Sequence, residues 1–267
     1  MITCLVTESN KLSQYSGNNF FNHTIEANYQ LPDDILQGIC EINPQTIGVF
    51  KHSELLVVDT NSKASYTITA NALRAGINVL TPNLINYSSE QIQELITIAH
   101  EIGVDLGFLP NTNFNLPNTS APIIMDCYRE SGKELNTENA LLQITSDLAY
   151  LLSAVKAEFR KVRVYWLPLY SQPFKTLKLI IDFNDNSVIT YLIKGQNETG
   201  LLKIELITDE LNRTFDIKDC YSQPEMFKEI VNQNIDYYIN QKEMMFTSNL
   251  ALKAKQIVEI ALKKICY

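Results

Sequence analysis

The run Leu55-Leu56-Val57-Val58 opens the stretch of this sequence, residues 55–117, that decides the fold. Four segments follow it through short connections: a helical pattern at 62–75, an apolar run at 77–80, a helical pattern at 88–102 and an apolar run at 104–109. Strands that alternate with helices through short connections pair in parallel. These segments therefore predict a parallel sheet with helices packed against it.

Both helical patterns carry signals for where they begin and end. Ser88 and Gln91 have the spacing of a capping box, and Gly76 and Gly103 each follow a last helical turn. The expected buried faces consist of Ile68, Ala72 and Leu73 in the first helix and Ile92, Leu95, Ile96 and Ala99 in the second.

A second region begins near residue 119, with a strong helical pattern at 137–154. Apolar, alternating segments then predict strands at 162–169, 177–183, 188–194, 201–208 and 214–217. Asp185-Asn186 between two of them is typical of a tight turn. Successive strands after a helix favour an α+β domain with a largely antiparallel, open sheet.

We therefore expect two domains. Residues 1–118 form a reduced Rossmann-like α/β domain with a parallel sheet, and residues 119–267 form the α+β domain. Helices are predicted at 224–240 and 247–264, and the latter can pack on the first domain. A weak strand pattern at 23–29 and a helical pattern at 32–42 complete the prediction.

The composition narrows the class of protein. The chain has 267 residues, 45% of them apolar and 19% charged, and no apolar run approaches the roughly 20 residues of a membrane span. Its five cysteines are scattered without a C-x-x-C pair, which argues against a zinc site or a disulfide framework. We expect a cytoplasmic protein without a metal and without a membrane partner.

The charge balance argues against nucleic acid as a ligand, and the glycines argue against a dinucleotide. Residues 1–118 contain 4 Lys and Arg against 11 Asp and Glu, which disfavours nucleic acid as a partner. A dinucleotide fold would carry G-x-G-x-x-G after its first strand, but the sequence reads Thr7-Glu8-Ser9-Asn10-Lys11-Leu12. None of the nine glycines forms a G-x-G pair, so the usual phosphate cradle is absent.

Basic and aromatic residues gather in the second region. We interpret the basic residues as a solvated sheet face, with a binding patch as the alternative. They are Lys161, Arg163, Lys175 and Lys178. The aromatic residues are Tyr165, Trp166, Tyr170 and Phe174. We interpret these four as core or oligomer interface, with sugar stacking as the alternative.

Several segments occur in an order known from one family. They are Asp59-Thr60-Asn61-Ser62, Ala72-Leu73-Arg74-Ala75-Gly76, Val79-Leu80, Asn113-Phe114-Asn115-Leu116-Pro117, the helix at 141–152 and the final helix at 249–259. Together they resemble the T-P-N, A-x-x-A-G, V-L-x-E-K-P, R-F-N-P, D-x-G-x-H-x-x-D and closing-helix segments of the Gfo/Idh/MocA oxidoreductases, the glucose–fructose oxidoreductase and inositol dehydrogenase family.

The resemblance implies where catalytic and cofactor residues would lie. Asn83 occupies the position of the lysine that binds the reacting hydroxyl, Asp147 that of the histidine acid/base, and Tyr150 that of the following carboxylate. The implied cofactor positions are Thr7, Ser9, Thr60 and Asn61. Asn83 cannot titrate, whereas Asp147 could take a proton if burial raised its pKa.

Three interpretations are open for Asn83, Gln143, Asp147 and Tyr150: polar residues around a vestigial cleft, a redesigned ligand site, or an active site with unusual residues. Our first hypothesis is a pseudoenzyme with no cofactor, which acts as a binding or oligomeric interaction protein. The alternative is an active NAD(P)-dependent sugar or polyol oxidoreductase. If the cleft is vestigial, Asp147→Ala should change stability little.

The resemblance also implies a partner. Members of this family commonly associate through the sheet of the second domain. We therefore expect a homo-oligomer through the C-terminal sheet, or pairing with an active paralogue.

Overall fold

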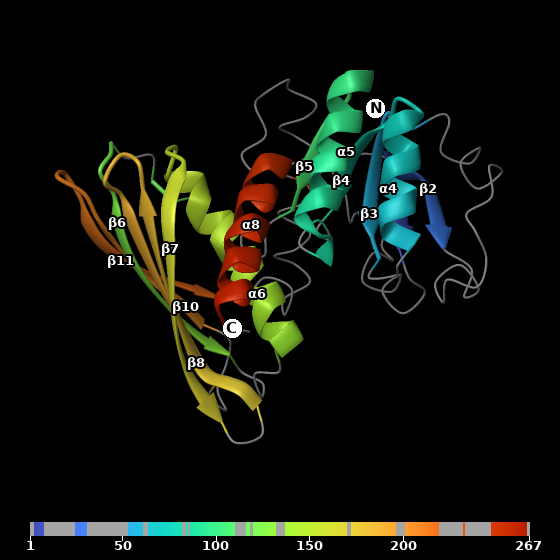
Figure 1. Ribbon diagram of the computed structural model, residues 1–267. Coiled ribbons are helices and arrows are strands. Elements are labelled where there is room, and N and C mark those ends of the chain that lie inside the picture. Colours follow the sequence, from blue (N-terminus) through green and yellow to red (C-terminus); the bar gives the residue numbers. More distant parts are fainter. Residues whose placement is uncertain are drawn as a thin grey trace. The chain divides into compact units, whose positions relative to one another are not determined.

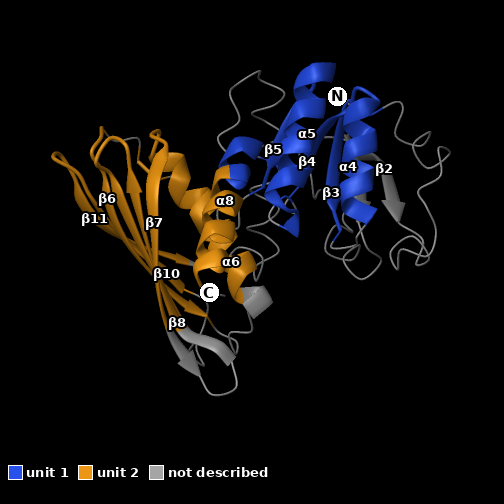
Figure 2. Cartoon of the chain, in the orientation of Figure 1, with its two compact units in different colours: residues 1–110, 224–252 blue, residues 111–223, 253–267 orange. Residues whose placement is uncertain are grey.

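The computed structural model describes residues 3–7, 25–30, 53–60, 64–81, 84, 86–109, 116–117, 120–131, 137–169, 172–195, 201–218, 232 and 247–265 (Figure 1). For residues 3–7, 25–30, 137–139, 167–169, 172–175, 195 and 218 it describes the backbone only. The chain divides into two compact units, 1–110 with 224–252 and 111–223 with 253–267 (Figure 2). The predicted helices at 32–42 and 224–240 lie outside the described residues, apart from Asn232.

The first unit contains a five-stranded sheet with the order β2-β1-β3-β4-β5. Its strands are β1 (Thr3–Thr7), β2 (Ile25–Gln30), β3 (Leu55–Asp59), β4 (Asn78–Thr81) and β5 (Leu106–Phe108). Every neighbouring pair in this order is parallel. β3 lies in the middle and all five of its residues are buried, as its continuous apolar run predicts. The expected Rossmann-like parallel sheet is confirmed.

Two helices pack beside this sheet, α4 (Ala64–Arg74) and α5 (Ser89–Ile102). The capping box is confirmed, since Ser88 Oγ accepts from Gln91 N and the Gln91 side chain accepts from Ser88 N. Gly103 closes α5 at φ 78°, a left-handed conformation that favours glycine. The expected burial of Ile96 is wrong in detail, because Ile98 is buried and Ile96 only partly so.

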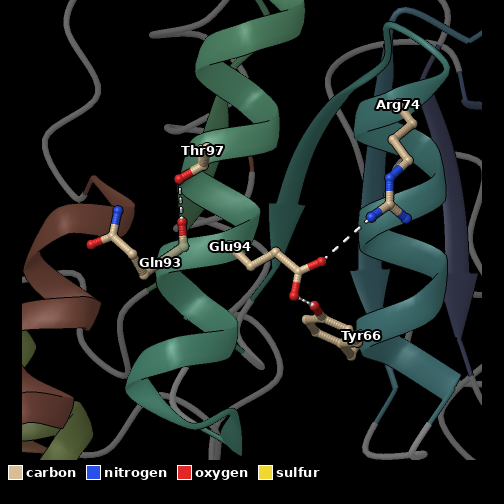
Figure 3. Close-up of polar contacts among 5 residues, drawn as sticks. All are labelled: Tyr66, Arg74, Gln93, Glu94 and Thr97. Carbon is tan, nitrogen blue, oxygen red and sulfur yellow. Dashed lines mark hydrogen bonds and ion pairs between the residues drawn. The ribbon is translucent and has the colours of Figure 1, made fainter.

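Polar side chains link the outer surfaces of α4 and α5 (Figure 3). The Tyr66 hydroxyl on α4 donates to Glu94 Oε2 on α5 at 2.5 Å, and Arg74 Nη2 lies 3.4 Å from Glu94 Oε1. Loss of solvation and the nearby Glu94 carboxylate raise the pKa of Tyr66 to about 12. Because these groups are exposed, the contacts orient the two helices more than they stabilise the fold.

The second unit contains a six-stranded sheet with the order β11-β10-β6-β9-β8-β7. Its elements are β6 (Ile124–Ser131), α6 (Thr137–Leu151), the short helix η2 (Leu152–Ala154), β7 (Phe159–Leu169), β8 (Gln172–Phe183), β9 (Val188–Gly195), β10 (Leu201–Ile207) and β11 (Asn212–Lys218). The last helix, α8 (Ser248–Ile265), has residues in both units. Every neighbouring pair of strands in this order is antiparallel except β6 with β9, which confirms a largely antiparallel sheet.

No strand is predicted at 124–131, but β6 forms there, between β10 and β9. Its exposed and buried residues alternate, and the buried positions are Met125, Cys127, Arg129 and Ser131. Two of these four are polar, so the apolar alternation that marks a strand is lost. This unpredicted strand makes the sheet mixed, because β6 pairs in parallel with β9.

The two faces of this sheet differ. One face is buried and carries Leu177, Leu179 and Ile181 from β8 and Ile189, Tyr191 and Ile193 from β9. The other is partly exposed, and Ile124 of β6 is 46% exposed on it. α6 lies on the buried side, since its Asp147 contacts residues of β6 and β9.

Within the described residues, no helix is long and apolar enough to cross a membrane. The same residues include no cluster of three or more His, Cys, Asp or Glu side chains that could hold a metal ion.

Candidate functional site

The carboxyl ends of the parallel strands in the first unit carry polar residues. Thr7 at the end of β1 is paired with Asp59 at the end of β3. Thr81 ends the next strand, β4, and its Oγ1 donates to the Val58 carbonyl at 2.8 Å. Open α/β sheets place their ligands at this edge. It is therefore the candidate ligand site of the first unit.

The structure brings some of the predicted cofactor residues to this edge. Thr60 follows β3 and is fully buried, and the backbone of Thr7 lies at the end of the neighbouring strand. Ser9 and Asn61 lie outside the described residues. The assignment of these residues to a cofactor therefore stays a prediction.

The edge residues suit one part of a dinucleotide better than another. Asp59, Thr60 and Thr81 offer a carboxylate and hydroxyls, which can hydrogen-bond the hydroxyls of a ribose. None of these three is a cation, and the sequence lacks the glycines that let backbone amides approach a pyrophosphate. All three are buried and engaged within the protein, so they shape the edge more than they reach out from it.

A second polar cluster lies inside the second unit and is centred on Asp147. Arg129 Nε on β6 donates to Asp147 Oδ2 on α6 at 2.8 Å, and Arg129 Nη2 donates to Oδ1. The Tyr191 hydroxyl on β9 donates to Asp147 Oδ2 at 2.6 Å. Arg129 and Asp147 are only 2% and 3% exposed. Both carboxylate oxygens are thus held by a buried, two-pronged ion pair.

Burial sets the protonation of the neighbouring groups. It raises the pKa of the Tyr191 hydroxyl well above 10.0, and the Asp147 charge raises it further. The pKa of Tyr150 is raised by burial and then by Cys127 and Asp147, and the pKa of Cys127 is raised by burial and Asp147. All three groups stay protonated near neutral pH. They can donate hydrogen bonds there, but none of them can act as a base.

The environment of Asp147 decides what it can do chemically. A general base needs an oxygen that reaches the substrate hydroxyl and can take its proton. Both carboxylate oxygens of Asp147 instead accept hydrogen bonds from Arg129 and Tyr191 in the protein interior. Asp147 thus links α6 to the sheet, and its place in a vestigial, redesigned or active site stays a prediction.

Of the other two predicted catalytic residues, Tyr150 and Asn83, the structure describes only Tyr150. Tyr150 lies one turn after Asp147 on α6 and is fully buried. Asn83 lies outside the described residues, so its role stays a prediction. Sequence reasoning missed Arg129 and Tyr191. An arginine at an inward position of a strand was the available signal, but it is visible only once β6 has been recognised.

Comparison with known proteins shows which proteins share this fold. No protein-family model matches the sequence, and no curated protein matches it either. Among solved structures, a dehydrogenase (MviM) from Clostridium difficile matches with a TM-score of 0.74 and 12% identity, over 98% of this chain and 99% of that one. GenD2 from gentamicin A biosynthesis, in complex with NAD, matches with a TM-score of 0.72 and 14% identity, over 99% and 94%.

A third match is a putative myo-inositol dehydrogenase from Sinorhizobium meliloti, with a TM-score of 0.68 and 9% identity, over 100% of this chain and 98% of that one. The chain has the fold of the Gfo/Idh/MocA dehydrogenases. At these identities the Gfo/Idh/MocA likeness establishes architecture and no activity. The expectation that no cofactor binds gains no support from it, since the structure of GenD2 contains NAD.

Proposed function

We propose that this chain is a Gfo/Idh/MocA homologue that has lost hydride-transfer catalysis and acts as a binding or oligomeric interaction protein. The observation that carries the proposal is the engagement of both Asp147 oxygens by Arg129 and Tyr191. By the resemblance, Asp147 stands where the family has its acid/base histidine. A carboxylate locked in a buried ion pair cannot exchange protons with a substrate without breaking that pair.

The partner we propose first is a second copy of the chain, bound through the outer face of the six-stranded sheet. On the two central strands this face carries three apolar side chains, Ile124 on β6 and Val188 and Leu192 on β9, among charged ones. Protein interfaces commonly combine apolar and polar side chains.

Opposite charges predominate on the two halves of this face. The half formed by β9, β8 and β7 carries Lys161, Arg163, Lys178, Asp182 and Lys194, a net charge of +3. The positions of this face on β11, β10 and β6 include Asp126, Glu130, Lys203, Glu205, Asp216 and Lys218, a net charge of −2. A two-fold axis parallel to the strands would place each half against the opposite half of a second copy.

The oligomer can be tested with a matched pair of variants. Lys178→Glu reverses a charge on the proposed interface, whereas Lys263→Glu makes the same change on α8, at an exposed position outside that face. We expect light scattering to give a dimer or larger species for the wild type and Lys263→Glu, and a smaller one for Lys178→Glu. A strictly monomeric wild type, or an oligomer that forms only with an active paralogue, contradicts self-association.

The loss of catalysis has its own test. Titration with NADH and NADPH, followed by nucleotide fluorescence and melting temperature, measures cofactor binding. A panel of sugars and polyols with NAD and NADP then measures turnover. We expect no turnover with any of them. Saturable cofactor binding with turnover of a polyol overturns the proposal.

The second candidate function is an active NAD(P)-dependent sugar or polyol oxidoreductase. It is favoured by the buried carboxylate and hydroxyls of Asp59, Thr60 and Thr81 at the ligand edge, and by the NAD bound to GenD2. NAD(P), when bound, would supply hydride chemistry at this edge. Saturable cofactor binding without turnover would leave a nucleotide-binding protein that lacks catalysis, which is consistent with the first proposal.

A further inference from the structure

β7 lies at one end of the six-stranded sheet and pairs with β8 alone in the observed strand order. It is a long strand, Phe159–Leu169, and its other edge faces no strand among the described residues. Such an edge presents unpaired N–H and C=O groups that can bind another extended chain. Figure 1 shows the strand along the border of the sheet.

The direction of the free backbone groups follows from one contact. Lys264 Nζ on α8 donates to the Val162 carbonyl, so that carbonyl points toward the outer edge. Backbone directions alternate along an antiparallel ladder, and the amides and carbonyls of Val164 and Trp166 therefore point the same way. Lys264 occupies the edge at Val162 and leaves the positions of Val164 and Trp166 for a new strand.

The side chains along β7 define the chemistry of a partner. Arg160 and Lys161 are exposed, and neither has a carboxylate within ion-pair distance among the described residues. The next cation, Arg163, is already paired with Asp182 at 2.7 Å. Two unpaired cations on a chain with a net charge of −8 favour an acidic partner segment.

The same strand exposes two large aromatic side chains. Tyr165 is 55% exposed and Trp166 is 37% exposed, and as neighbours in a strand they project from opposite faces of the sheet. Tyr165 shares its face with Lys161, whereas Trp166 shares the other face with Val164. A strand laid along this edge would thus meet a cation and a phenol on one face and apolar side chains on the other.

We propose that β7 is a docking edge for an extended segment of a partner protein in which acidic and apolar residues alternate, and that this segment adds to the sheet as a further strand. Its backbone pairs with Val164 and Trp166, its acidic residues face Lys161, and its apolar residues face Val164 and Trp166. Strand addition of this kind takes affinity from the main chain and specificity from alternate side chains. The backbone groups of Val164 and Trp166 lie at the edge of the sheet, whereas Lys161 also belongs to the outer face of the proposed dimer. The peptide titration tests the edge by itself, and the oligomeric state tests the dimer.

The probe is a short fluorescein-labelled peptide of alternating Glu and Val, titrated with the full chain and followed by fluorescence anisotropy. We expect saturable binding that weakens as salt is raised, because the contact with Lys161 is exposed. A peptide of alternating Lys and Val should bind at least about tenfold more weakly, and one of alternating Glu and Pro should not bind, since proline lacks the donor N–H.

Two variants separate strand addition from simple charge attraction. Val164→Pro removes an outward N–H that the sheet itself does not use, and proline is tolerated at edge positions. It should weaken binding of the Glu-Val peptide about tenfold, whereas Val164→Thr, which keeps the N–H, should bind like the wild type. Circular dichroism and the melting temperature check that both variants fold.

Three outcomes overturn the proposal. The first is an absence of saturable binding of the Glu-Val peptide, and the second is equal binding by Val164→Pro and Val164→Thr. The third is a wild type that forms an oligomer and does not bind the peptide, together with a Val164→Pro variant that is monomeric. The occupant of the edge would then be a second copy of this chain.

Discussion

The guanidinium of Arg129 on β6 holds both carboxylate oxygens of Asp147 on α6, with an Nε to Oδ2 distance of 2.8 Å. The contact joins the buried face of the sheet to the helix that covers it. Tyr191 adds a third hydrogen bond to the same carboxylate from β9. Two strands and one helix therefore meet at a single buried anion.

Removing one partner of this pair should be costly. Arg129→Leu leaves Asp147 buried without its counter-charge, and we expect the free energy of unfolding to fall by about 3–5 kcal/mol. The double variant Arg129→Leu with Asp147→Leu buries no charge and should recover most of that loss. Urea unfolding measures all three proteins. A single variant within about 1 kcal/mol of the wild type contradicts the prediction.

The same reasoning replaces the expectation, drawn from the sequence, that Asp147→Ala changes stability little. That variant removes the carboxylate that pairs with the buried guanidinium of Arg129.

The Tyr191 hydroxyl can be removed without changing the shape of the ring. Tyr191→Phe deletes the donor to Asp147 Oδ2, and a hydrogen bond to a charged group contributes about 1.5–3 kcal/mol. We expect the free energy of unfolding to fall by that amount in urea unfolding at neutral pH. As a control, Tyr165→Phe alters a hydroxyl on a ring that is 55% exposed and should have almost no effect.

Alkaline pH should test the buried Tyr87. Burial raises its pKa from 10.0 to about 12. The unfolded chain then loses this proton at a lower pH than the folded chain. Stability from this group is complete below pH 10.0 and declines up to about pH 12. The decline amounts to about 3 kcal/mol.

Tyr87→Phe should flatten that decline in unfolding experiments run across the alkaline range. The variant also loses the hydrogen bond between Tyr87 and Ser65, so the slope against pH is compared and not the absolute stability. An unchanged slope in Tyr87→Phe would show that other groups cause the alkaline loss.

The start of α5 should depend on Ser88. Ser88→Ala removes the oxygen that accepts from Gln91 N and should lower the free energy of unfolding by about 1 kcal/mol. Thr97→Ala is a matched control on the same helix: its Oγ1 donates only to the Gln93 carbonyl, which the helix already satisfies (Figure 3). Thermal unfolding should place Thr97→Ala near the wild type. Equal losses in the two variants would exclude a specific cap.

The first unit was accessible from sequence because its signals are local. The capping box at Ser88 and Gln91 and the stop at Gly103 need only a few neighbouring residues, and the buried run of β3 needs only five. The sequence did not show that Ile98 and not Ile96 is buried in α5. Which side of a helix is covered depends on the elements packed against it.

The buried cluster of the second unit was not accessible, because it depends on register. Tyr191 faces Asp147 only because β9 lies beside β6 with Cys127 opposite Tyr191, a pairing that joins distant segments. Arg129 looks like a surface residue until the strand that turns it inward is known. The residue types at 143–150 led to the hypothesis of lost chemistry, but only the structure shows the contacts of Asp147 with Arg129 and Tyr191.

The first unit is discontinuous, since it combines residues 1–110 with residues 224–252, and Gly107 of β5 forms an antiparallel bridge with Thr247. On the ribosome, β5 emerges long before Thr247 has been made. Its edge therefore stays without this bridge until synthesis is nearly over. A nascent chain stalled in the second unit would expose an unfinished sheet, so premature termination should yield products that chaperones and proteases recognise.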